Sequence, residues 1–260
     1  MSEFVAVSQA GSLATITLNR PERLNALVPG MGADYVKALH AADMDPEVRG
    51  ILVTGAGRGF CSGADISLLE QSPDSLETFV TGVEDLPTQA FHLHTPVATA
   101  INGPCAGVGF VLAICADARF VHPDATLTTS FARLGLVAEY GVAWVLPRLI
   151  GLPAATDLLL TGRTITGREA EALGMAVCAD DPVEAARSWL QSIADHSSPT
   201  SVGSIKEQLL ESWQMDLDAS AQDSLRRMKD SFRRPDLAEA LRARSEKRTP
   251  RFSPYERTPQ

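Results

Sequence analysis

Long apolar runs, surplus positive charge and paired cysteines are all missing from this chain of 260 residues. No stretch of eighteen apolar residues occurs, so we expect no membrane-spanning helix. Acidic residues outnumber basic ones by 32 to 23, and the formal charge of −9 argues against nucleic acid as the main partner. The four cysteines form no Cys-x-x-Cys pair and the first residues resemble no secretory signal, which favours reduced thiols and a cytoplasmic location.

Several motifs of well-known active sites are also missing. The five histidines include no His-Glu-x-x-His motif and no cluster with zinc spacing, so the sequence predicts no metal site. There is no Gly-x-Ser-x-Gly elbow for a serine nucleophile, no phosphate-binding loop ending in Gly-Lys-Ser or Gly-Lys-Thr, and no dinucleotide-binding Gly-x-Gly-x-x-Gly in a first βαβ unit. We therefore expect a protein that needs neither a metal nor a redox cofactor.

Strand and helix patterns alternate through the first half of the chain. Apolar and β-branched residues predict strands over residues 5–9, 13–18, 48–54, 96–101 and 119–121. Helical patterns cover residues 31–42, 74–94 and 107–116, and a further helix is expected from Asp65 onward. Such alternation predicts an α/β fold with largely parallel strand pairing, because crossover helices cover the faces of the sheet.

Helical patterns dominate after Pro147. They cover residues 153–161, 167–173 and 182–194, and the segment 196–201 interrupts them. Beyond this break, apolar residues recur every three or four positions, as in Leu225, Met228 and Phe232, which indicates amphipathic helices. We therefore expect an α/β core over residues 1–197 and a helical module over residues 198–260 that packs on the core or on a neighbouring subunit.

Two glycine-rich segments each lead directly into a predicted helix, and they cover residues 57–66 and 101–117. The first N–H groups of a helix lack partners within the helix and carry partial positive charge. If the N–H groups of Ala64 and Val108 converge, they form an oxyanion hole for one developing negative oxygen. The alternative is that both segments are simply helix starts with small residues for close packing.

The motifs FCSGADI, RPERLNAL and INGPCAG, together with FARLGLVAEYG and GRTITGREAEALGMA, resemble the crotonase superfamily, also called the enoyl-CoA hydratase/isomerase family. The resemblance covers nearly the whole chain, with the motifs in the family's order. It implies a spiral core of repeated ββα units and a C-terminal helical module that completes the site and the homotrimer or dimer of trimers. It also implies an acyl-CoA substrate whose thioester oxygen is held by the N–H groups of Ala64 and Val108.

The same resemblance implies a coenzyme A pocket as part of substrate binding. Its lining would come from six positions, which are Arg23, Ala26, Ser62, Gly63, Asp65 and Ile66. Positive charge from Arg20 and Arg23 suits the phosphates of the ligand, and the small residues allow a ligand close to the backbone. Without the resemblance, two arginines in a loop would be read as solvated surface residues.

Hydratases of this family use two glutamates, and this chain has Val111 and Phe131 at those positions. Neither side chain transfers a proton, so ordinary two-glutamate hydration is not expected. Glu139, in LVAEYG, stands where the family's Δ3,Δ2-enoyl-CoA isomerases carry their single carboxylate. Burial among apolar neighbours should raise the pKa of Glu139 and make it a stronger base. The alternative is that Glu139 is an idle turn residue or a helix cap.

Other residues of this region have plainer interpretations. Phe131, Leu134 and Trp144 are candidates for the lining of an acyl pocket, although such residues are often ordinary core. Asp117 is another acid, for which a structural hydrogen bond to nearby backbone or to Arg119 is expected.

Three functions follow from the sequence. The leading hypothesis is an isomerase that converts 3-enoyl-CoA to 2-enoyl-CoA through Glu139. The second is an enoyl-CoA hydratase of the type found in fatty-acid β-oxidation. The third is a non-catalytic homologue that binds acyl-CoA, which the loss of both hydratase glutamates suggests.

Overall fold

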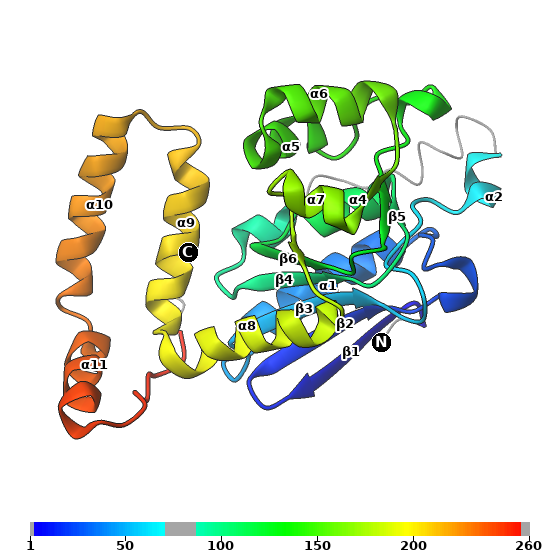
Figure 1. The fold of residues 1–260 in the computed structure, drawn as a ribbon. Helices are drawn as coiled ribbons and strands as arrows, with labels where there is room; N and C mark the ends of the chain where they lie inside the picture. The colour runs from blue at the N-terminus through cyan, green and yellow to red at the C-terminus, as the bar shows by residue number, and fades with distance from the viewer. Residues whose placement is uncertain (1–2, 71–86, 256–260) are drawn as a thin grey trace.

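A six-stranded sheet forms the centre of the protein (Figure 1), whose computed structural model describes residues 3–70 and 87–255. Its strands lie in the order β1-β2-β3-β4-β6-β9. Their bounds are β1 (Val5–Ala10), β2 (Leu13–Leu18), β3 (Gly50–Gly55), β4 (Val97–Ile101), β6 (Ala118–Val121) and β9 (Val177–Cys178). β1 and β2 form an antiparallel hairpin and every other neighbouring pair is parallel, which confirms the predicted α/β class.

A second, small sheet stands beside the first. It contains β5 (Cys105–Ala106), β7 (Thr126–Thr128) and β8 (Ile165–Thr166), in that order. β5 pairs with β7 in parallel, and β7 pairs with β8 in the antiparallel sense. These strands are too short to produce an apolar alternation, so the sequence pattern did not predict them.

The two faces of the central sheet are covered by different helices. Side chains alternate between the faces along each strand, so Leu52, Ala98 and Phe120 contact α8 (Pro182–His196) on one face. Ile51 and Val97 join the larger core cluster on the other face, which includes α1 (Met31–Met44) and α4 (Val108–Ile114). Figure 1 shows α8 on one side of the sheet and α4 on the other.

The connecting segments carry the remaining short helices. They are η1 (Pro21–Arg23), α2 (Ile66–Leu69), η3 (Pro87–His92), η4 (Ala132–Leu134), α5 (Val142–Ile150), α6 (Leu152–Thr161) and α7 (Gly167–Ala172). The helix predicted over residues 74–94 lies largely outside the described residues. Where the structure does describe it, residues 87–92 form a 3-10 helix and residues 93–94 lie beyond its end, so this part of the prediction was too long.

Three helices at the C-terminal end project from the core as an arm, as Figure 1 shows: α9 (Pro199–Ser212), α10 (Leu217–Ser231) and α11 (Pro235–Glu246). α9 is anchored by Lys206, which is 8% exposed and donates hydrogen bonds to Asp117 at 2.5 Å and to the Thr95 carbonyl oxygen at 2.9 Å. Asp117 also accepts a hydrogen bond from the Val97 N–H, so its structural role is confirmed, with Lys206 as its charged partner. Within residues 3–70 and 87–255, no helix combines the length and the apolar composition needed to cross a membrane.

Candidate active site

Two glycine-containing turns meet beyond the carboxyl ends of β3 and β4. The first turn, residues 61–64, runs beside Leu27 on one side and beside β5 on the other. On the first side, Leu27 donates to the Gly63 carbonyl oxygen at 2.8 Å, and Asp65 donates to the Leu27 carbonyl oxygen at 2.9 Å. On the second side, the N–H of Ala106 donates to the carbonyl oxygen of Cys61 at 2.9 Å. The turn before α4 is therefore fixed to the turn before α2.

Glycine is required where these turns touch. Gly63 has φ of 100° and Gly107 has φ of 53°, a region that residues with a Cβ atom rarely adopt. A Cβ atom on Gly63 would lie 3.0 Å from the Ala106 carbonyl oxygen, and one on Gly107 would lie 3.8 Å from the Gly63 Cα atom. The two turns thus pack backbone against backbone, directly before Ala64 and Val108.

The N–H groups of Ala64 and Val108 have no hydrogen-bond acceptor among the described residues. The bridge to Leu27 uses the N–H of Asp65, so the N–H of Ala64 faces away from Leu27. Val108 is the first residue of α4, where an N–H group has no partner within the helix. Both residues therefore supply unused donors from turns in contact, as an oxyanion hole requires.

An arginine and an aspartate support the first turn. Arg20 pairs with Asp65 at 3.0 Å, and both side chains are nearly buried, at 13% and 14% exposure. Hydrogen bonds from Ser67 and from Arg20 lower the pKa of Asp65. This pairing differs from the expectation that Arg20 offers charge to a phosphate, because its guanidinium is already neutralised. Arg23 is exposed and carries no such partner among the described residues.

The other predicted coenzyme A residues gather around the same turn. Ser62 donates through its N–H to Leu24 and through its hydroxyl to the carbonyl oxygen of Arg23, which joins the turn to η1. Ala26 is buried beneath this loop, whereas Ile66 is 71% exposed at the start of α2. The structure therefore brings together Arg23, Ala26, Ser62, Gly63, Asp65 and Ile66 on the two segments 20–27 and 62–66.

Asn25 is a supporting residue that the sequence analysis did not identify. It is fully buried, and its side-chain amide donates to the carbonyl oxygens of Ala56 at 3.0 Å and Gly59 at 2.8 Å. Its Oδ1 accepts the Arg20 N–H at 2.8 Å. The left-handed backbone at Leu24 and Asn25 is thus held in place, and an asparagine inside the apolar motif RLNAL was the available signal.

Glu139 lies in the turn that leads into α5. Its side chain is half-buried, and desolvation by this burial raises the pKa of Glu139 above that of an ordinary glutamate. Its carbonyl oxygen accepts the Val142 N–H at 3.0 Å, while Gly141 is the N-cap of the helix, so the carboxylate itself is not the cap. α5 packs on α4, the helix that begins with Val108, so Glu139 lies in the turn before a helix that adjoins the helix of the second donor.

The apolar candidates fall into two groups. Phe131 and Val111, at the hydratase positions, are buried at 3% and 0% exposure within the main core. Trp144 is half-buried against that core, whereas Leu134 is 60% exposed on η4. Of the three residues predicted to line an acyl pocket, Phe131 is therefore core and Leu134 is surface in the single chain.

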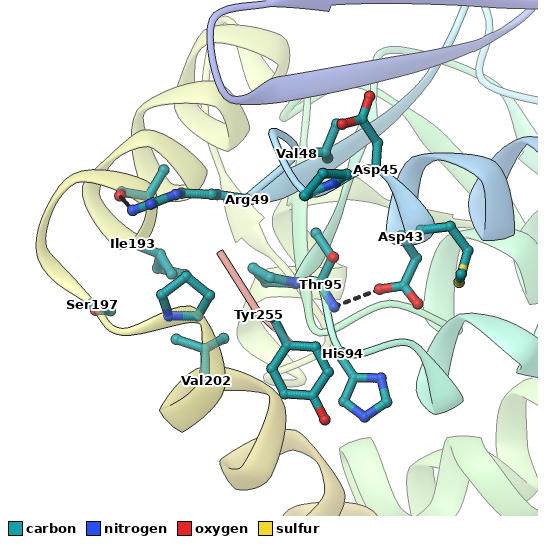
Figure 2. Close-up of a pocket in the computed structure, with 15 residues that line it drawn as sticks. Asp43, Asp45, Val48, Arg49, His94, Thr95, Ile193, Ser197, Val202 and Tyr255 are labelled. Carbon is teal, nitrogen blue, oxygen red and sulfur yellow. Dashed lines mark hydrogen bonds between the residues drawn. The ribbon is translucent and has the colours of Figure 1, made fainter. Parts of the chain in front are cut away.

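A cavity of about 250 Å³ lies at the other edge of the sheet, near the amino ends of β3 and β4 (Figure 2). Asp43, Arg49, His94 and Tyr255 surround it, and none of the predicted site residues lines it. It is therefore distinct from the Ala64–Val108 site. In the described part of the chain, no three or more His, Cys, Asp or Glu residues are grouped so that they could hold a metal ion.

Comparisons with known proteins identify the family of this chain. The family model described as "Enoyl-CoA hydratase/isomerase" matches residues 8–254. The 1,2-epoxyphenylacetyl-CoA isomerase of Escherichia coli is 32% identical, over 97% of this chain and 99% of the relative. A crystal structure of a probable enoyl-CoA hydratase/isomerase from Mycobacterium abscessus has a TM-score of 0.90 at 30% identity, covering 96% of this chain and 99% of that one.

A crystal structure of an enoyl-CoA hydratase from Bacillus anthracis is equally similar in fold, with a TM-score of 0.90 at 28% identity, and the match covers 96% of this chain and 99% of that chain. The family match spans both donor turns, Glu139 and the C-terminal helices. The chain therefore belongs to the enoyl-CoA hydratase/isomerase family of acyl-CoA-processing enzymes.

Proposed function

We propose that the protein isomerises a 3-enoyl-CoA to the 2-enoyl-CoA. Glu139 removes a proton from C2 of the thioester, and the electron pair moves onto the thioester oxygen. The N–H groups of Ala64 and Val108 hold this oxyanion, each donor contributing about 3 kcal/mol in the transition state. The protonated Glu139 then returns the proton to C4, and the double bond becomes conjugated with the thioester.

The observation that carries this proposal is that Glu139 is a half-buried carboxylate, whereas the two positions at which hydratases have glutamates are apolar in this chain. Val111 and Phe131 are buried and accept no proton, whereas the raised pKa of Glu139 suits a group that both takes and gives one. A single carboxylate is sufficient for a 1,3-proton transfer. The relative named 1,2-epoxyphenylacetyl-CoA isomerase supports isomerisation as a reaction class within the family.

Hydration of a 2-enoyl-CoA is the second candidate, and one observation favours it. The Glu139 side chain is only half-buried, so a water molecule can approach the carboxylate. A water held by Glu139 would attack C3 while the same oxyanion hole stabilises the enolate. This candidate uses the same residues, but it needs one carboxylate to take the proton of water and to supply a proton to C2.

One assay separates the candidates. Purified protein is given a 3-enoyl-CoA and, separately, a 2-enoyl-CoA, while the absorbance of the conjugated thioester is followed. Isomerisation produces that absorbance from the first substrate, hydration removes it from the second, and binding without either change identifies a non-catalytic protein. A Glu139→Gln variant that keeps the full isomerase rate would refute the proposed proton transfer. The matched control is Glu22→Gln at an exposed position of η1, which removes one negative charge away from Glu139.

The C-terminal helices support a proposal about assembly. α10 buries none of its residues in the single chain, although Leu225, Met228 and Phe232 form an apolar row at 45–60% exposure. A second copy of the chain is the occupant that the family resemblance implies, and a homotrimer is the expected assembly. Light scattering on the purified protein should give three times the chain mass of 27.8 kDa, or six times for a dimer of trimers.

A further inference from the structure

A cluster of aromatic rings connects the C-terminal arm with α5, the helix that follows the turn of Glu139. Trp213, at the end of α9, meets the Trp144 ring of α5 edge-on, with 4.7 Å between the ring centroids and 65° between the planes. It also meets Phe91 of η3 at 6.2 Å and 70°. The Arg148 guanidinium lies 4.2 Å from the centroid of Trp144 and 5.8 Å from that of Trp213.

The same cluster continues by hydrogen bonds to the turn of Glu139. Arg148 donates to the Trp144 carbonyl oxygen at 2.9 Å, and the Trp144 N–H donates to the Gly141 carbonyl oxygen at 2.9 Å. The first turn of α5 then holds the Glu139 carbonyl oxygen through the Val142 N–H. Each link from Trp213 to Glu139 is therefore a direct contact, a hydrogen bond or a single helical turn.

The turn of Glu139 has a second neighbour that Trp213 also contacts. A Cβ atom on Gly141 would lie 3.6 Å from the Cγ2 atom of Thr88, so η3 packs directly beside this turn. η3 carries Phe91, the other ring against Trp213. Trp213 thus fixes two of the elements that flank Glu139. Tyr140 and Gly141, both with left-handed backbone, form a turn that such packing must hold.

We propose that Trp213 is a positioning residue that fixes the turn carrying Glu139 against α5 and η3. Edge-on aromatic pairs and a cation over a ring have specific geometry, so the contact sets an orientation as well as burying area. The role rests on the proposed function insofar as Glu139 is the proton carrier. Substrate does not need to touch Trp213 for this role.

Truncation of Trp213 should loosen the turn and increase the hydration of the half-buried Glu139 carboxylate. The ring already borders a cavity of about 130 Å³, so Trp213→Ala enlarges an existing gap beside α5. A misplacement of the reacting group by 1 Å costs about 10²-fold in rate, and we expect a kcat loss of that order with little change in KM. The better-hydrated carboxylate should titrate closer to the ordinary glutamate pKa of about 4.3. Trp213→Phe keeps a ring edge and should retain most of the rate.

The test measures the pKa of Glu139 directly. Carboxyl-labelled glutamate is incorporated, the Glu139 carbon resonance is identified by its loss in Glu139→Gln, and its titration is compared among the wild type, Trp213→Ala and Trp213→Phe. The matched control is Trp189→Ala, which removes a half-buried tryptophan of α8. Its ring centroid lies 6.4 Å from that of Phe120, on the face of the sheet that α8 covers. Isomerase kcat and KM are measured on the same samples.

A lower Glu139 pKa in Trp213→Ala, with Trp213→Phe and Trp189→Ala close to the wild type, supports the proposal. A folded Trp213→Ala variant in which Glu139 titrates as in the wild type overturns it, and so does an equal shift in Trp189→Ala. A different result would show that the proposed function is wrong, namely the full isomerase rate in Glu139→Gln or no isomerase activity in the wild type. In that case the titration still decides whether Trp213 positions Glu139.

Discussion

The contact between the two glycine turns gives a sharp prediction. In a Gly63→Ala variant, the new methyl group lies 3.0 Å from the Ala106 carbonyl oxygen, closer than ordinary van der Waals contact. That oxygen belongs to backbone that hydrogen bonds fix to the first turn, so it cannot rotate away like a flexible side chain. The turns should separate by a few tenths of an ångström, which moves the N–H groups of Ala64 and Val108 away from their common oxygen.

The loss of one donor sets the upper limit of the effect. Removing a donor from an oxyanion hole lowers kcat by about 10²- to 10³-fold, equivalent to about 2.7–4 kcal/mol. A shift of a few tenths of an ångström weakens the donors without removing either, so Gly63→Ala should reduce kcat by about tenfold and change KM much less, because the donors act mainly in the transition state. The φ of 100° adds a cost in folding stability, since a left-handed backbone costs a residue with a Cβ atom about 1–2 kcal/mol.

Gly11→Ala separates the two effects. Gly11 has φ of 58° in the β1–β2 turn, and a Cβ atom there would meet nothing within 4 Å. This variant should also lose stability, measured by urea unfolding, but should keep the wild-type kcat. If Gly63→Ala retained kcat within about threefold, a change of about 0.65 kcal/mol, the inferred convergence of the two N–H groups would be wrong.

Further predictions concern charge and thiols. Burial raises the pKa of Glu139 in the folded protein, so the stability from this group is full below the ordinary glutamate pKa of about 4.3 and is lost as the pH rises from there through the raised folded-state pKa. At pH 7, Glu139→Gln should therefore unfold at a higher temperature than the wild type; an unchanged or lower midpoint would contradict this. Lys206→Met, which removes the charged partner of Asp117, should cost about 3–5 kcal/mol in urea unfolding, and adding Asp117→Asn should recover part of it; a loss below about 1 kcal/mol would contradict a stabilising ion pair at this site. A thiol reagent should modify half-buried Cys178 before the three buried cysteines, which should react only after unfolding, since burial raises the pKa of Cys61 and Cys115 to about 12. Partial burial and the nearby Glu171 also raise the pKa of Cys178, so its reaction should be slow at pH 7 and faster at higher pH; equal reaction rates of all four thiols in the native protein would refute this.

Periodicity predicted the central elements because their residues have one face, or both faces, in the core. β3 and β4 are buried at every position, and α1, within the helical pattern predicted over residues 31–42, buries Tyr35, Val36 and Leu39. The two donor turns could also be located, since glycines that precede a helix mark both of them. Burial of Glu139 was expected from the sequence, but its extent required the structure, because the loop residues 132–138 before it are exposed whereas Glu139 is half-buried.

Contacts between distant segments could not be predicted from local pattern. Lys206 meets Asp117 across 89 residues, and the isolated sequence around Lys206 reads as an ordinary solvated helix face. The pairing of Arg20 with Asp65 likewise spans 45 residues and removes Arg20 as a free cation. The meeting of Trp213 with Trp144 depends on where α9 leaves the core, which no spacing within α9 specifies.

The proposed oxyanion hole is made of peptide N–H groups, so it does not depend on the identity of any side chain. Exchanging the alanine or valine at those positions alters bulk but leaves the dipoles in place, provided that both glycines remain. Glu139, the proposed proton carrier, lies on a separate stretch of chain, ahead of α5. In the proposed mechanism, the position of the acid can therefore change without any change in the backbone that holds the oxyanion.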